Sequence, residues 1–474
     1  MTSRTQRRIG QNLGIVDPHS KIGVLYRSER LKKLEDYYYN RQHDDKIPWL
    51  DAERAEAEIP LGMRKPLVIY PLPKIHTARI ASKLFGEGIF PRIMATEEEE
   101  LTRTVIPQVK KLIHFETQML DIARKVLAFG SAFVRLRVHE SLLQLEVYAP
   151  NKCYPSFNTR GDLEAIKIQY VFEDHAEWDK DTKGPKKKWF CLKLTDGVDT
   201  LYNTPDYEEG ITPEFTVVEE VEHNLGEVQG VWVKNTKDSL RIDGDSLIEH
   251  ILELGDCISR NLSQADGAAS YIMEPQTVFR GMTEDEVDDL TKSRNKSWHL
   301  GQEGEANFLE IQGAGLVTAS DHEKKMQQKA QEVTRAIMHD PEKIVGSAQS
   351  AKAMEILNAP LVELVNELRP IFGDALIQIL RKVLFLAMRY KLSIVGKDNL
   401  VLENIDWELD WGDIFEPTLI DFQTEVSTYA QATNANLISR ETALRNLAKK
   451  FQIEDVEKEL ARINAQPQLG GGLF

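Results

Sequence analysis

The chain has 474 residues, 42% of them hydrophobic and 28% charged, and these ordinary proportions exclude a globally disordered chain. Its 59 Lys and Arg against 75 Asp and Glu leave a formal net charge of −16, which argues against a protein whose main task is tight binding of nucleic-acid phosphates. The three cysteines, Cys153, Cys191 and Cys257, form no CxxC pair, so neither a disulfide framework nor a zinc site is expected.

The N-terminal half combines a basic opening, helices and a sheet. Arg4, Arg7, Arg8 and Arg27 in the opening could contact nucleic acid, although a solvated arm followed by a helix face is the favoured interpretation. No apolar signal-peptide core follows, and no window approaches eighteen apolar residues, so neither export nor a membrane span is expected. Apolar spacing predicts a helix over 105–129 that ends at Gly130. Alternation from about 130 to 235 predicts sheet.

Two helical patterns flank a small insert in the middle of the chain. From 245 to 273 apolar residues recur every three or four positions, which predicts one amphipathic helix of roughly 43 Å. Asp243-Gly244-Asp245 is interpreted as a turn that caps this helix, with a cation site as the alternative. The stretch 275–318 combines short extended runs, a short acidic helix pattern and turns with glycine, which predicts a small insert of mixed structure. A second helix follows, with Met326, Ala330 and Val333 on one face.

The second helix ends at Asp340-Pro341, where a hinge bearing Gly346 and Ser347 begins. Helical periodicity then persists for some forty residues through Pro360 and Pro370, which predicts one bent helix. The stretch 392–411 returns to strand alternation. The remainder is predicted to be helical, with breaks near Asn434 and Ile453.

The usual catalytic motifs are missing from the sequence. There is no phosphate-binding GxxxxGK[ST] loop, no complete dinucleotide fingerprint, no HExxH and no GxSxG. The sequence therefore indicates neither an enzyme nor a cofactor. An enzyme acting on nucleic acid would need clustered carboxylates for a metal pair.

The order of these segments resembles the portal proteins of tailed bacteriophages over almost the whole chain. The early helix ends in KLEDYYYN, and ARIASKLFGEG is followed by IFPRI. FGSAFVRLRV precedes LEVYAPNKCYPSF, in which Pro150 to Pro155 form a turn between strands, and NLISRETALRNLAKKFQIEDVEKELARI is similar to the terminal helix pair of the family. Each phrase is weak alone, and their order is what is specific.

The resemblance implies a multidomain α+β fold. Its parts would be wing 1–244, stem helix 245–273, clip 274–320, stem helix 321–339, tunnel loop 340–350, long kinked helix 351–392, wing return strands 393–415, and helical crown with tail 416–474.

The resemblance also implies the function. Such proteins form a ring, probably of twelve subunits, at one capsid vertex of the virion after assembly in the host cytoplasm. Double-stranded DNA would pass through without sequence specificity during packaging and ejection. The expected partners are the terminase large subunit, a head-tail adaptor, and capsid and scaffolding proteins, with no membrane and no cofactor. An acidic chain suits this task, because strong phosphate binding would stall sliding DNA.

Candidate functional residues follow by position. The tunnel-loop candidates are Lys343, Ile344, Val345, Gln349, Ser350 and Lys352, with an ordinary exposed linker as the alternative. Lys324, Lys325 and Lys329 would line the bore or an intersubunit face. The clip candidates for partner binding are Glu284, Asp285, Glu286, Asp288, Asp289, Lys292, Arg294, Lys296 and Trp298.

The physical expectation behind the ring is that a single subunit cannot bury the stripe of residues 245–273, so a neighbouring copy covers it. The alternative function is a static head or tail scaffold ring that never conducts DNA. Such a scaffold would not need a hinge followed by a kinked helix.

Overall fold

The computed structural model describes residues 21–55, 57–86, 88–96, 98, 100–139, 142–179, 183–236, 241–273, 277–280, 305–308, 314–336, 351–392, 405–415, 419–448, 453 and 456–465. The chain divides into two compact units, Met1–Ile337 with Glu363–Gly412 and Met338–Val362 with Asp413–Phe474.

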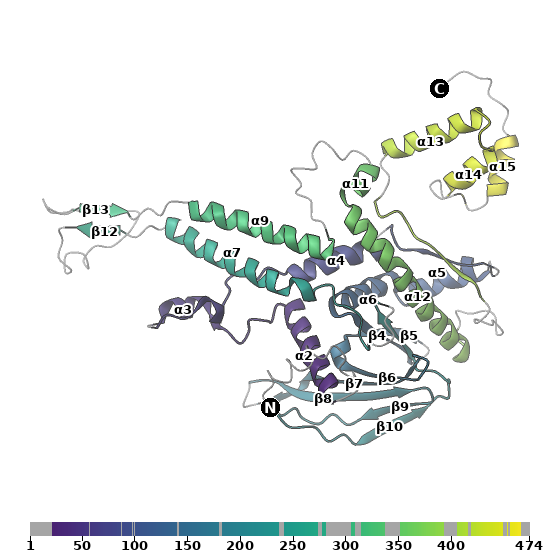
Figure 1. The fold of residues 1–474 in the computed structure, drawn as a ribbon. Helices are drawn as coiled ribbons and strands as arrows, with labels where there is room; N and C mark the ends of the chain where they lie inside the picture. The colour runs from purple at the N-terminus through teal and green to yellow at the C-terminus, as the bar shows by residue number, and fades with distance from the viewer. Residues whose placement is uncertain are drawn as a thin grey trace. The chain divides into compact units, whose positions relative to one another are not determined.

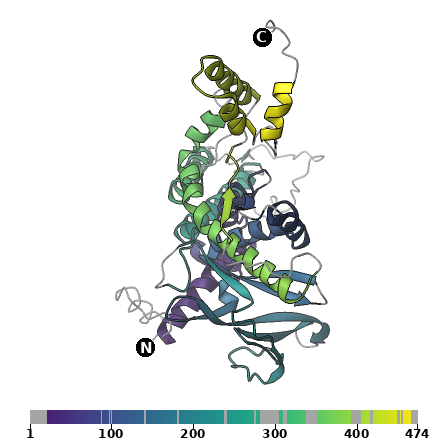
Figure 2. The same ribbon diagram turned by 90° about the vertical axis from the view of Figure 1, so that its right-hand side faces the viewer.

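Two antiparallel sheets lie below most of the helices of the first unit in the views of Figures 1 and 2. The three-stranded sheet has the order β11-β4-β5 and consists of β4 (Ser131–His139), β5 (Leu142–Tyr148) and β11 (Gly230–Lys234). The five-stranded sheet has the order β10-β9-β8-β7-β6 and consists of β6 (Cys153–Phe157), β7 (Leu163–Asp179), β8 (Gly184–Thr195), β9 (Val198–Tyr202) and β10 (Val217–Glu222). A turn, η3 (Pro150–Lys152), precedes β6. The sheet predicted for 130–235 is confirmed.

The same unit contains the helices α2 (Lys21–Tyr38), α3 (Trp49–Arg54), α4 (Leu72–Phe85), α5 (Ile106–Leu112) and α6 (Phe115–Phe129), with the short 3-10 helix η1 (Leu61–Met63) and the π-helix η2 (Leu101–Val105). The predicted helix 105–129 ends at Gly130 as expected, at a φ of 91°. It is not continuous, because His114 adopts a left-handed conformation with a φ of 49° and separates α5 from α6.

Short strand pairs complete the first unit. β1 (Ile47–Pro48) pairs in parallel with β2 (Arg64–Lys65), and β3 (Arg92–Ala95) pairs antiparallel with β14 (Trp407–Asp410). β14 lies in the predicted return stretch 393–415, of which 393–404 lies outside the described residues.

The helix pair α7 (Leu252–Met273) and α9 (Ala314–Thr334) runs side by side (Figure 1). The predicted start at 245 was wrong: Ser246 Oγ and Leu247 N donate to carbonyls of α6 at 2.6 and 2.9 Å, so helix begins only with η4 (Glu249–Ile251). The second helix was also misplaced. It starts within the predicted insert 274–320, because Gly315 in its first turn does not break it.

The insert between the paired helices contains an antiparallel hairpin. β12 (Thr277–Arg280) pairs with β13 (Glu305–Phe308). α9 ends at Thr334 rather than at the predicted 339.

The predicted bent helix 351–392 is two helices, α11 (Ala351–Leu357) and α12 (Ala359–Arg389). The break lies at Asn358, whose side chain donates to Met354 O at 2.7 Å. Pro360 cannot donate a backbone N–H to the preceding turn, which favours this break. Pro370 stays inside α12, as expected.

The second unit contains α13 (Leu419–Asn434), α14 (Arg440–Ala448) and α15 (Val456–Ala465). The predicted break near Asn434 is confirmed, and Ile453 lies outside any helix. An apolar cavity of about 310 Å³ lies among these helices.

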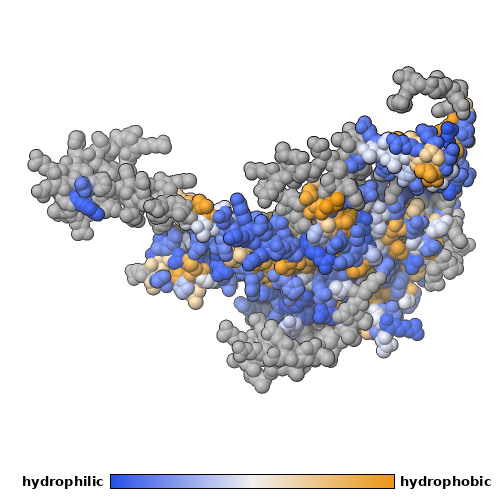
Figure 3. All heavy atoms as spheres, turned by 45° about the horizontal axis from the view of Figure 1, so that its top comes forward, coloured by the Kyte–Doolittle hydropathy of each residue, from blue (hydrophilic) through white to orange (hydrophobic). Residues whose placement is uncertain are grey.

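Hydrophobic surface appears as separate patches among hydrophilic residues on the face drawn in Figure 3. Within the described part of the chain, no helix has the length and apolar character to span a bilayer. The mixture of helices with antiparallel sheets confirms the predicted α+β class.

Candidate functional site

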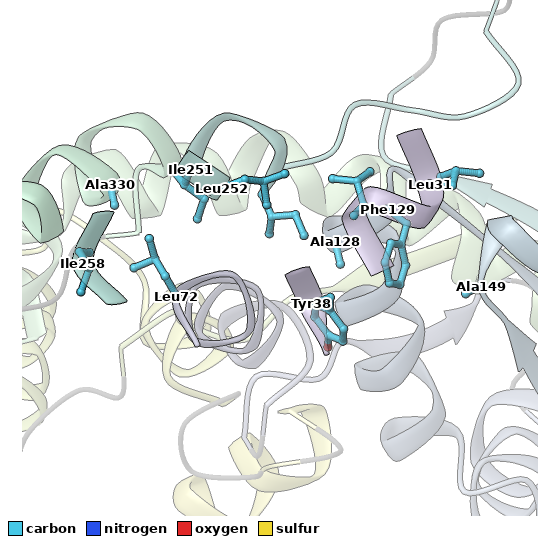
Figure 4. Close-up of a cluster of buried hydrophobic side chains, with 12 residues drawn as sticks. Leu31, Tyr38, Leu72, Ala128, Phe129, Ala149, Ile251, Leu252, Ile258 and Ala330 are labelled. Carbon is cyan, nitrogen blue, oxygen red and sulfur yellow. The ribbon is translucent and has the colours of Figure 1, made fainter. Parts of the chain in front are cut away.

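The inner half of the α7–α9 pair is buried by its own chain. Ile251 of η4 and Leu252 and Ile258 of α7 pack in one cluster with Leu72 of α4 and Ala330 of α9 (Figure 4). Leu31 and Leu34 of α2 belong to the same cluster. The expectation that a single subunit leaves the whole stripe uncovered was therefore wrong for this half. The reason is that α2 and α4 close over the base of the pair.

The outer half of the pair is covered less. Leu262, Ala265 and Ala269 continue the stripe of α7 but are only partly buried. Val317 at the start of α9 is 64% exposed. At the other end of α9, Val333 is exposed although it was predicted to share the buried face of Met326 and Ala330. The apolar surface of the outer half thus remains available to another partner.

Polar contacts fix α2 to the base of α7. Arg30 forms an ion pair with Glu249 at 2.7 Å, and Tyr37 Oη donates to Asp256 Oδ2 at 2.6 Å. Burial followed by this hydrogen bond raises the pKa of Tyr37. Burial alone would raise the pKa of Asp256, but the hydrogen bonds from His43 and Tyr37 bring it below its usual value. The start of α7 is therefore held by charge as well as by packing.

A buried ion pair joins α2 to the sheets. Arg27 Nε donates to Asp243 Oδ2 at 2.6 Å, and Ser131 Oγ donates to Asp243 Oδ1 at 2.6 Å. Asp243 is thus neither a helix cap nor a cation ligand, which corrects the interpretation of Asp243-Gly244-Asp245. Arg27 is correspondingly unavailable to nucleic acid. The described residues contain no cluster of three side chains able to hold a metal ion.

Two buried serines attach the chain before α4 to α7. Ser259 Oγ accepts from Tyr70 N at 3.0 Å, and Ser263 Oγ accepts from Val68 N at 3.1 Å. Each hydroxyl donates its own proton to a carbonyl one turn earlier in α7. Sequence reasoning missed both serines, although their i, i+4 spacing on a helix was visible.

The three lysines predicted on the second stem helix are exposed on α9. Lys325 and Lys329 lie one turn apart, whereas Lys324 points about 100° away from Lys325. Asp321 and Glu332 lie on the same face as Lys325 and Lys329. This mixture of charges makes the face a weak site for phosphate.

A buried histidine marks the end of α9, next to the predicted tunnel loop. Thr334 Oγ1 donates to Ala330 O at 2.8 Å, so His76 Nδ1 must donate to Thr334 Oγ1 across their 2.6 Å contact. His76 Nε2 then has no hydrogen-bond partner among the described residues. Burial, assisted by Arg79, lowers the pKa of His76 to about 4. The histidine is therefore neutral at neutral pH.

The remaining predicted site residues are not brought together by the described structure. The tunnel-loop candidates from Lys343 to Ser350 and the clip candidates from Glu284 to Trp298 lie outside the described residues. Lys352 lies in α11.

The chain belongs to the phage portal protein family. The family model described as "Phage portal protein, SPP1 Gp6-like" matches residues 23–468, which confirms the resemblance drawn from the order of segments. No curated protein matches the chain.

Two solved structures are distantly similar to the chain. A chain of "Neck of empty GTA particle computed with C6 symmetry" is 10% identical, with a TM-score of 0.40, and the match covers 84% of this chain and 92% of that one. A chain of "Virion of native gene transfer agent (GTA) particle" is 9% identical, with a TM-score of 0.40 and coverage of 80% and 89%. Both likenesses are distant, so the assignment rests on the family match.

Proposed function

We propose that copies of this chain assemble into a closed ring, probably of twelve subunits, that conducts double-stranded DNA through a capsid vertex during packaging and ejection. The observation that carries the proposal is the portal family match over residues 23–468. The ring would be part of the virion and would assemble in the host cytoplasm.

The helix pair α7–α9 supports lateral packing in such a ring. Its inner half is fixed to the rest of the subunit, whereas Ala265, Ala269 and Val317 keep apolar surface in the outer half. A head-to-tail contact between neighbouring pairs would remove this surface from water. The weak phosphate affinity expected for the face of Lys325 and Lys329 suits DNA that must slide.

The partners are proposed from family membership. The terminase large subunit and a head-tail adaptor would dock on the clip, and capsid and scaffolding proteins would contact the outside of the ring. The chain itself would have no enzymatic activity. Turnover of DNA by the purified chain with magnesium or manganese would contradict this last point.

Particle images and native mass spectrometry of the purified chain test the ring. A closed ring with a central hole wide enough for duplex DNA is the expected result. A chain that stays monomeric at high concentration, alone and with scaffolding protein, would overturn the proposal.

Deleting residues 343–350 distinguishes a DNA channel from a static scaffold. For a channel, rings persist but the yield of DNA-filled particles falls, because the loop contacts the moving duplex. Normal yields of filled particles would favour the scaffold ring that never conducts DNA.

A further inference from the structure

The most acidic stretch of the chain forms a free edge of the five-stranded sheet. Residues 194–233 contain ten carboxylates and no lysine or arginine. β9 and β10 lie in this stretch, and β10 is the last strand in the order β10-β9-β8-β7-β6. Its outer side therefore presents backbone N–H and C=O groups that pair with no strand among the described residues, beside a high density of negative charge.

Most of this charge is not compensated within the described residues. Three carboxylates have a cationic or imidazole partner: Asp199, Asp206 and Glu227. Six others on β10 and the loop before it are exposed and form no ion pair with the described residues: Glu208, Glu209, Glu214, Glu219, Glu220 and Glu222. β10 and these six carboxylates are called the acidic edge below. Such a surface is complementary to a basic partner.

The acidic edge also exposes apolar side chains. Val217, Val218 and Val221 are each at least half exposed. Val221 lies opposite Asp199 and Val217 opposite Tyr202, so the two valines lie on opposite faces of the sheet. Charges alone could protect an edge strand from pairing. Exposed valines on both faces do not protect it, and they fit a strand that another strand covers.

We infer that the basic N-terminal segment of a neighbouring copy, residues 1–20, adds to β10 as a further strand. This inference rests on the ring of the proposed function. The segment lies outside the described residues, and it contains Arg4, Arg7 and Arg8 but only one acidic residue, Asp17. Strand addition provides backbone hydrogen bonds, and the arginines supply the charge that the acidic edge lacks.

The ring of the proposed function, and not the reach of the segment, selects a neighbouring copy. The segment leads into α2, where Arg27 Nη1 donates to Cys153 O of β6 at 3.0 Å. β6 is the opposite edge of the sheet from β10, but five strands measure only about 20 Å across, so the segment is also long enough to reach β10 of its own chain. A head-to-tail ring joins two different surfaces of neighbouring copies, and the opposite edges of one sheet are two such surfaces.

The reach and the charge pattern also fit. Twenty extended residues span at most about 66 Å. In an extended segment Arg4 and Arg8 share one face and Arg7 takes the other. On β10, Glu220 and Glu222 share one face and Glu219 takes the other.

Charge reversal tests the inference with two variants and their combination. The arm variant carries Arg4→Glu, Arg7→Glu and Arg8→Glu, and the edge variant carries Glu219→Lys, Glu220→Lys and Glu222→Lys. The combined variant carries all six substitutions in one chain. Circular dichroism checks that each variant folds, and native mass spectrometry measures the concentration at which half of the chains are in rings.

Each single variant is expected to need an about tenfold higher concentration for assembly, since three exposed ion pairs are replaced by repulsions. An equal mixture of the two variants restores assembly, because each reversed arm then meets a complementary edge on the other chain. The combined variant assembles as the unaltered chain does.

Other outcomes overturn the inference in distinguishable ways. Single variants that assemble normally exclude docking on the acidic edge, while the ring itself stands. If the combined variant restores ring assembly but the mixture does not, the N-terminal segment docks on its own chain. If neither the mixture nor the combined variant assembles into rings although both fold, the charges act on another surface. An unaltered chain that forms no ring removes the proposed function and this inference together.

Discussion

The inner and outer halves of the α7–α9 pair carry one continuous apolar stripe but bury it differently. Ile251 and Ile258 are fully buried against α2, α4 and α9, whereas Ala265 and Ala269 are only partly covered. An amphipathic pattern therefore indicates that a helix has a partner, but not whether that partner belongs to the same chain. The base of the pair is part of the subunit core, and the stripe of α7 keeps partly exposed apolar surface in the outer half.

The largest effect is expected from breaking the buried charge pair that fastens α2 beside the base. Asp243→Ala leaves Arg27 buried without its partner, so the free energy of unfolding falls by about 4 kcal/mol. Asp243 and Arg27 have only 6% and 14% of their side chains exposed. Urea unfolding followed by circular dichroism measures the loss.

Asp245→Ala is the matched control for this substitution. Asp245 pairs with Arg241 at 2.7 Å, but both side chains are 64% exposed. Solvent screens such a pair, so the change in the free energy of unfolding stays within about 0.5 kcal/mol. If Asp243→Ala and Asp245→Ala lower the free energy of unfolding equally, the buried ion pair between Arg27 and Asp243 does not hold α2 in place.

The second prediction compares the two halves directly. Ile258→Ala in the inner half removes a fully buried side chain and lowers the free energy of unfolding by about 3 kcal/mol. Val317→Ala in the outer half changes it by less than about 0.5 kcal/mol, but weakens ring assembly. Urea unfolding and native mass spectrometry of both variants separate the effects. If Ile258→Ala were as mild as Val317→Ala, the distinction between the halves would be lost.

The sequence predicted the class of fold and the order of segments well, because those depend on periodicity. Alternation identified the sheet between 130 and 235, and spacing identified both helices of the α7–α9 pair. The predicted ends of these helices were wrong where tertiary contacts determine them. The N–H of Leu247, for example, donates to a carbonyl of α6 and is not part of α7. The candidate site was predicted less well. His43 and Asp256 are far apart in the chain, although His43 Nε2 and Asp256 Oδ1 lie 3.1 Å apart. No local sequence pattern indicates this contact.

The third prediction concerns the inner end of α9 and its dependence on pH. The pKa of His76 is about 4 in the folded chain, against about 6.5 when unfolded. Between pH 6.5 and pH 4, His76 is therefore protonated in the unfolded chain but neutral in the folded chain. This contribution to stability is complete above pH 6.5, is lost as the pH falls towards 4, and amounts to about 2 kcal/mol between pH 7 and pH 5.

Urea unfolding at pH 7 and pH 5 measures this loss, and His76→Gln is the control. Glutamine does not titrate, so the difference between the two pH values should shrink by about 2 kcal/mol in this variant. A His76→Gln chain with an unchanged pH dependence would show that other groups titrate on unfolding.

The smallest effect is expected from the serines that attach residues 68–70 to α7. Ser259→Ala removes the acceptor of Tyr70 N, which lowers the free energy of unfolding by about 1 kcal/mol even though alanine is the better helix former. Ser270→Ala is made on the same helix, where Ser270 Oγ bonds only to Asp266 O and is exposed. Without a lost partner, the helix propensity of alanine raises stability by about 0.3 kcal/mol. Opposite signs for the two substitutions in urea unfolding are thus the expected result, and equal signs would mean that Ser259 does not hold the preceding segment against the base of the pair.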